Sequence, residues 1–134
     1  MRNEFNLRGE NSLIMQTDIN HEADIRTLVD AFYKRAGKDD LLGPIFSKIQ
    51  NAGDHKESLY EYWTNSLLRE YSGSPERFPS HIELMFSTKH FIRWLTLFLD
   101  TIDLLYSGPV AEKAKVMVIK KSEEFQAKVE LSRF

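Results

Sequence analysis

An apolar stripe with helical spacing between residues 88 and 106 constrains the fold of this chain more than any other sequence feature. Large side chains recur there at intervals of three and four residues, as on the buried face of a helix. The stripe consists of Phe91, Trp94, Leu95, Phe98, Ile102 and Leu105. We expect a helix from about Thr88 to Tyr106, because Gly108 and Pro109 follow it. Other helices must cover so large an apolar face.

The segment from near Asn20 to Gly37 is expected to form another helix. Asn20 is a suitable N-cap, and acidic residues in the first turn favour the positive end of the helix dipole. The apolar face of this segment consists of Ile25, Leu28, Val29 and Phe32, with Tyr33 at its edge. Residues 41–46 are apolar but contain Gly43-Pro44, which predicts a tight turn with a short helical piece.

Two more helices complete the predicted architecture. One begins at Asp54, with Glu57 in a position that resembles a capping box, and ends near Tyr71. Its inner stripe and the residues beside it are His55, Leu59, Tyr62, Trp63, Ser66 and Leu67. The last helix begins at Pro109, a good first helical residue. Its inner stripe is Ala111, Ala114, Val118, Phe125 and Val129. The sequence shows no strand pattern, so it predicts an all-α protein.

Length and composition exclude several classes of protein. A chain of 134 residues should form one domain, here residues 15–134, preceded by a loose N-terminal tail at 1–14. The absence of cysteine excludes disulfides, thiolate metal sites and cysteine nucleophiles. A net charge of −2 without a basic patch argues against binding to nucleic acid. No apolar run reaches the roughly 18 residues of a membrane span, and no signal peptide is recognisable, so a cytoplasmic protein is expected.

Histidines are the candidate nitrogen ligands for a metal ion, and they occur at positions 21, 55, 81 and 90. His21 is expected in the first turn of a helix, where a structural role is the simplest interpretation. His81 follows a loop at 72–80 that contains glycine and prolines, and a short helix from Ser80 to Phe86 would place it beside Leu84 and Met85. His81 could therefore lie beneath a flat cofactor.

His90 competes with His81 for the role of metal ligand. The two are nine positions apart, so one helical face cannot present both to the same ion. His90 lies one turn before Trp94, which suits a contact with the edge of a cofactor. Spacing alone favours His81 modestly and leaves both candidates open.

An imidazole beside large apolar side chains is the environment that a flat, apolar, iron-bearing cofactor needs. A zinc site is disfavoured, because cysteine is absent and no His-Glu-x-x-His motif occurs. The alternative is a helical interaction domain without a cofactor, in which Tyr33 and Trp94 are ordinary core residues.

Several segments of the chain resemble the truncated haemoglobins, most closely their group III. They are Ala31–Arg35, Leu42–Phe46, His55–Trp63 and His90–Phe98. The last of them begins nine residues after His81 and resembles the pattern that this group has around its proximal histidine and pocket tryptophan. The resemblance extends in order from about Ile19 to Val129.

This resemblance implies a globin-like, truncated two-over-two helical sandwich around haem b. It implies His81 as the proximal iron ligand, Tyr33 and Trp94 as hydrogen-bonding groups facing a gas ligand, and His55 at the mouth of the pocket. The other residues expected at the haem pocket are Phe32, Phe46, Leu59, Trp63, Met85, His90 and Phe91.

The function implied by the resemblance is reversible binding of O₂, CO and NO. A polar distal pocket would suit retention of the ligand, or chemistry of NO or peroxide of the kind carried out by NO dioxygenases and peroxidases. Diatomic gases are the expected partners, a reductase is a further candidate, and we expect a monomer or weak dimer that binds neither nucleic acid nor membrane.

Overall fold

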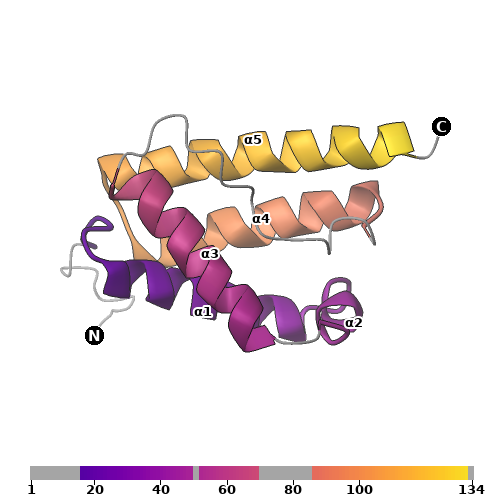
Figure 1. Ribbon diagram of the computed structural model, residues 1–134, viewed down its shortest axis with the longest axis horizontal. Helices are drawn as coiled ribbons and strands as arrows, with labels where there is room; N and C mark the ends of the chain where they lie inside the picture. Colours follow the sequence, from indigo (N-terminus) through magenta and orange to yellow (C-terminus); the bar gives the residue numbers. More distant parts are fainter. Residues whose placement is uncertain (1–15, 50–51, 70–85, 133–134) are drawn as a thin grey trace, which may run out of the picture.

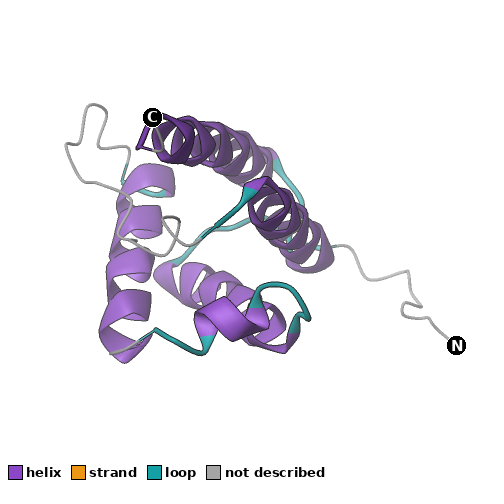
Figure 2. Cartoon of the chain, turned by 90° about the vertical axis from the view of Figure 1, so that its right-hand side faces the viewer, coloured by secondary structure: helices purple, strands orange, loops and turns teal. Residues whose placement is uncertain are grey.

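Five helices form the computed structural model, which describes residues 16–49, 52–69 and 86–132. They are α1 (Glu22–Lys38), α2 (Gly43–Phe46), α3 (Ala52–Leu67), α4 (Thr88–Leu105) and α5 (Pro109–Ser132). Figure 2 shows helices joined by loops, and the described ranges contain no strand. The prediction of an all-α protein is therefore confirmed. Among these helices none combines the length and the apolar character that a membrane span requires.

The helices form two pairs that pack on each other. α4 and α5 lie side by side, and α3 crosses α1 (Figure 1). α1 also packs against α4 and against the short α2, and α3 contacts α5. α1 is therefore in contact with three other helices, and its side chains help to build most of the core.

The predicted apolar stripes form the centre of this core. The buried members of the α4 stripe are Phe91, Trp94, Phe98 and Ile102. Those of α1 are Ile25, Leu28, Val29 and Phe32. In α5, the expected stripe is buried at Ala111, Ala114, Val118 and Val129, while Phe125 is only partly buried. Hydrophobic periodicity thus identified the faces along which the helices pack.

Several helix ends differ from those expected. His21, and not Asn20, is the N-cap of α1, and the Asp24 carboxylate accepts the backbone N–H groups of both residues. His21 therefore precedes the first turn in which it was expected. α1 continues through Gly37 to Lys38. A histidine cap lies outside the usual Ser, Thr, Asp and Asn preference, so sequence gave little indication of it.

The other corrections concern α3 and the segment before α4. α3 begins at Ala52, before the expected Asp54, and ends at Leu67 instead of near Tyr71. Tyr71 itself lies outside the described residues, as do the predicted loop at 72–80 and most of the predicted helix from Ser80 to Phe86. Phe86, the last residue of that predicted helix, is not helical. α2 has the short helical form expected from Gly43-Pro44.

Asp18 joins the segment before α1 to the start of α5. Its carboxylate accepts the backbone N–H groups of Val110 at 2.9 Å and Ala111 at 2.8 Å. Gly108, which precedes α5, has a φ of +145°, and a Cβ atom there would lie 2.5 Å from the Asp18 Cγ. The glycine therefore provides both the backbone conformation and the space that this contact requires.

The pKa of Asp18 reflects these contacts. Burial acts to raise it, but hydrogen bonds from the backbone of Val110, Ala111 and Ile19 outweigh burial and lower the pKa below its usual 3.8. A depressed pKa stabilises the folded state above the usual pKa. That stabilisation is lost as the pH falls through the folded-state pKa.

We predict that Asp18→Ala lowers the free energy of unfolding by about 1–2 kcal/mol at neutral pH, because α5 loses the acceptor at its N-terminus. The difference from the wild type should shrink as the pH falls below about 3.8. Urea denaturation at a series of pH values measures both effects. Asp40→Ala, which removes an exposed carboxylate, is the control. An equal loss of stability in both variants would contradict the role of Asp18.

Candidate functional site

Tyr33 and His55 meet where α1 faces the beginning of α3. Their ring centroids are 5.6 Å apart and their planes are inclined by 66°. The Tyr33 ring also contacts Phe46 of α2, with 5.5 Å between centroids. Three helices therefore contribute to this small aromatic group, and both residues were predicted from the sequence to lie at one pocket.

The Tyr33 hydroxyl is the polar group of greatest interest in this group. Its oxygen is buried, and it has no hydrogen-bond partner within the described ranges. A buried hydroxyl without a partner costs about 1–3 kcal/mol relative to one that is satisfied. Such a group is expected where a ligand completes the hydrogen bonding.

Phe32 forms an apolar wall next to Tyr33. Its ring lies 6.0 Å from Phe46, 6.2 Å from Trp94 and 4.6 Å from Phe98, measured between centroids. These contacts join α1 to α2 and α4. Together with Tyr33, which contacts Phe46, the predicted pocket residues Phe32, Phe46 and Trp94 therefore belong to one continuous aromatic cluster.

Leu59 and Trp63 lie on the inner face of α3 and are both buried. The Trp63 ring is 5.7 Å from Phe98 and 5.3 Å from Tyr62, which places it within the core between α3 and α4. Leu59 lies one turn after His55 on the same helix. α3 therefore presents a stripe that runs from the half-buried His55 into the centre of the protein.

His90 caps α4. Its Nδ1 accepts the backbone N–H of Ser87 at 3.0 Å and lies 2.8 Å from the Ser87 hydroxyl oxygen. Its ring stacks on Phe86, with 5.6 Å between centroids. Burial, followed by the charge of Lys89, lowers the pKa of His90. Because Nδ1 is an acceptor here, the neutral ring carries its proton on Nε2.

The capping role of His90 could have been found from the sequence. Ser87 precedes it by three residues, which is the spacing of a capping box with histidine in the place of glutamate. Phe91, the next residue, is buried and contacts Phe86 at 5.2 Å between centroids. The structure therefore places His90 and Phe91 at the start of α4, beside each other.

His81 and Met85 lie outside the described residues, so the expected iron ligand is not located. Within the described ranges, no three His, Cys, Asp or Glu side chains converge in a way that could hold a metal ion. The described helices thus provide aromatic walls and a buried hydroxyl. These features fit one face of a haem, whose ring is flat and apolar and whose gas ligand accepts hydrogen bonds.

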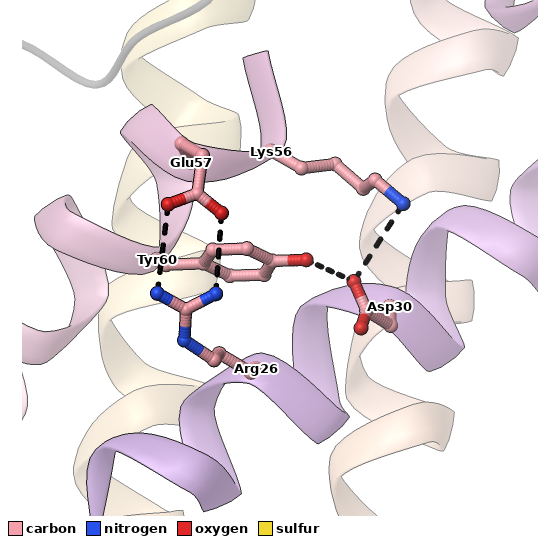
Figure 3. Close-up of polar contacts among 5 residues, drawn as sticks. All are labelled: Arg26, Asp30, Lys56, Glu57 and Tyr60. Atoms are coloured by element: carbon pink, nitrogen blue, oxygen red, sulfur yellow. Dashed lines mark hydrogen bonds and ion pairs between the residues drawn. The ribbon is translucent and has the colours of Figure 1, made fainter. Parts of the chain in front are cut away.

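Two polar contacts near the site were not predicted. Arg93 of α4 donates to the Asp39 carboxylate at 2.6 Å and so ties α4 to the end of α1. Burial acts to raise the pKa of Asp39, but hydrogen bonds from the Leu42 backbone and from Arg93 lower it overall. The second is a cluster of polar contacts between α1 and α3, formed by Arg26, Asp30, Lys56, Glu57 and Tyr60 (Figure 3). Both join residues far apart in sequence, which local patterns do not reveal.

The sequence and the structure of the chain are both similar to group III truncated haemoglobins. No protein-family model matches the chain. It is 31% identical over 113 residues to a group 3 truncated haemoglobin of Campylobacter jejuni, covering 78% of this chain and 84% of that protein. It also resembles the crystal structure of a group III truncated haemoglobin from Campylobacter jejuni, with a TM-score of 0.70, 24% identity, and coverage of 86% of this chain and 95% of the other. The predicted globin-like fold is confirmed.

We predict that Tyr33→Phe raises the free energy of unfolding of the cofactor-free protein by about 1–2 kcal/mol, because it removes a buried hydroxyl without a partner. Tyr106→Phe is a matched control, since the Tyr106 hydroxyl donates to the Asp24 carbonyl at 3.1 Å. That change should lower stability by about 0.5–1.5 kcal/mol. Denaturation of the two variants measures the contrast. Equal destabilisation by both would show that the Tyr33 hydroxyl is satisfied.

Proposed function

Because this chain belongs to the group III truncated haemoglobins, we propose that it binds haem b and, through the haem, O₂, CO and NO. The observation that best supports this proposal is the buried Tyr33 hydroxyl beside His55, which has no hydrogen-bond partner in the described ranges. In a protein whose helices only packed together, phenylalanine at this position would give higher stability than tyrosine. In a protein that holds a small polar ligand, the tyrosine hydroxyl would strengthen binding by a hydrogen bond to that ligand.

Haem supplies an iron atom with an open coordination position at which a diatomic gas binds. In this proposal His81 would hold the iron, as the family resemblance implies. Phe32 and Phe46 pack against the ring, and His55 lies at the mouth of the pocket. Leu59, Trp63, Met85, His90 and Phe91 complete the proposed surroundings.

Tyr33 and Trp94 have different roles as hydrogen-bonding groups. A tyrosine hydroxyl can donate or accept, whereas an indole N–H can only donate. A hydrogen bond contributes about 0.5–1.5 kcal/mol, so two donors would slow release of a partly negative ligand by roughly ten- to a hundredfold. This favours retention of the ligand, or turnover of NO or peroxide, over rapid oxygen delivery.

Turnover of NO or peroxide would require electrons from a partner, for which a reductase is the proposed source. NO consumption by the reduced protein under O₂ tests this activity. The competing proposal is a helical interaction domain without a cofactor. A Soret absorption band in the purified protein supports the haem protein, and its absence after reconstitution with haemin would support the interaction domain.

We predict that His81→Ala abolishes stable haem binding, because the iron loses its protein ligand. His90→Ala should retain the Soret band, because the Nδ1 of His90 caps α4. Haem titration followed by absorption spectroscopy measures both variants. Loss of haem only in His90→Ala would reverse the assignment of the iron ligand.

We also predict that Tyr33→Phe speeds O₂ dissociation by roughly two- to tenfold, as expected for the loss of one hydrogen bond to the ligand. Stopped-flow displacement of O₂ by CO measures this rate. Tyr106→Phe, which alters a hydroxyl bonded to Asp24, should leave it unchanged. An O₂ dissociation rate in Tyr33→Phe equal to that of the wild type would remove Tyr33 from the proposed ligand contacts.

A further inference from the structure

α1 directs a stripe of polar side chains toward α3. Arg26, Asp30 and Tyr33 follow one another at intervals of four and three residues, so they lie on one face of the helix. The opposing residues come from the first turns of α3, where Lys56 and Tyr60 are one turn apart. Figure 3 shows Arg26 and Asp30 of α1 opposite the side chains of Lys56, Glu57 and Tyr60 of α3.

The part of this helix contact that lies farther from Tyr33 joins Arg26 to α3. Its guanidinium donates to both oxygens of Glu57, at 3.1 and 3.5 Å, and lies 4.5 Å from the centre of the Tyr60 ring. A bidentate pair combined with a stacked ring fixes orientation as well as distance. Arg26 therefore sets the position of the Tyr60 side chain.

The part of the helix contact that lies nearer to Tyr33 is centred on Asp30. Its carboxylate accepts a hydrogen bond from the Tyr60 hydroxyl and lies 3.8 Å from the Lys56 ammonium (Figure 3). Burial, followed by the hydrogen bond to Asp30, raises the pKa of Tyr60 to about 12. The tyrosine is therefore a donor at physiological pH. One carboxylate thus holds two side chains of α3.

Lys56 extends this cluster to the proposed pocket. Its ammonium lies 5.8 Å from the centre of the Tyr33 ring, a distance compatible with cation–π attraction. Lys56 is also the neighbour of His55, whose ring is 5.6 Å from that of Tyr33. A change in the position of Lys56 therefore acts on Tyr33, which is proposed to face the gas ligand, and on the turn that carries His55, which is proposed at the mouth of the pocket.

We propose that Asp30 and Lys56 are positioning residues that hold the Tyr33–His55 pair and thereby set the rate at which a gas ligand passes it. This inference rests on the proposed function, because it assumes that Tyr33 and His55 face the haem pocket. Neither Asp30 nor Lys56 touches the ligand. They act through the orientation of Tyr33 and through the first turn of α3.

The exposure of the pair determines the size of the expected effect. The side chains of Lys56 and Asp30 are 34% and 52% exposed, so their attraction is weakened by solvent. α3 stays anchored by the buried Leu59 and Trp63, so loss of the pair should leave the fold intact. The equilibrium between the held and the displaced positions of the Tyr33–His55 pair should change by roughly two- to fivefold, as expected for the loss of a partly exposed ion pair.

The test compares Lys56→Met, Asp30→Asn and the double variant as haem-loaded proteins. Flash photolysis of the CO complex should show CO association about two- to fivefold faster in each single variant. The double variant should be no faster than the faster single, because both changes remove the same interaction. The Fe–C stretching frequency in resonance Raman spectra should shift as well, since it reports the polar groups near the ligand.

Arg69→Met is the matched control. Arg69, two residues after the end of α3, and Glu22, the first residue of α1, form an ion pair at 3.3 Å with similar exposure. This variant should keep the wild-type rate and spectrum. Unchanged CO association and Raman frequency in Lys56→Met and Asp30→Asn, or equal changes in Arg69→Met, would overturn the positioning role alone. A wild-type protein without a Soret band would overturn the proposed function together with it.

Discussion

The burial of Phe32 is the constraint on which the rest of the structure depends. Its ring contacts aromatic side chains of α2 and α4, and its own helix packs against α2, α3 and α4. Successive residues of a helix point about 100° apart, because each turn holds about 3.6 residues. Fixing Phe32 in the core therefore directs Tyr33 toward the start of α3, where it meets His55.

The two faces of α1 have different physical characters, and the candidate site lies where they meet. The apolar face fixes the helix in the core, since buried aromatic rings dominate packing energy. The polar face sets how α3 lies against α1 through Asp30 and Arg26. Its weaker, solvent-screened contacts can change without unfolding the protein. A rigid core and an adjustable polar contact are thus combined on one helix.

Sequence predicted those features that depend on local patterns. The stripes of α1, α4 and α5 were identified because one side of each helix is apolar. The N-cap at His21 was missed, because a histidine there is a weak signal. Asp18 at α5, Asp39 at Arg93 and Asp30 at Lys56 were missed for another reason: each joins residues distant in sequence. Tyr33, His55 and Trp94 were selected as site residues through family resemblance. The roles of Tyr33 and Trp94 as ligand contacts and of His55 at the mouth of the pocket remain predictions.

The most direct test of the central claim is the distance between the Tyr33 hydroxyl oxygen and the outer atom of CO in a crystal structure of the haem-loaded CO complex. Our account predicts a hydrogen-bond distance of about 2.6–3.2 Å, with His55 at the mouth of the same pocket. A Tyr33 hydroxyl directed away from the ligand, or a haem bound elsewhere in the fold, would contradict it.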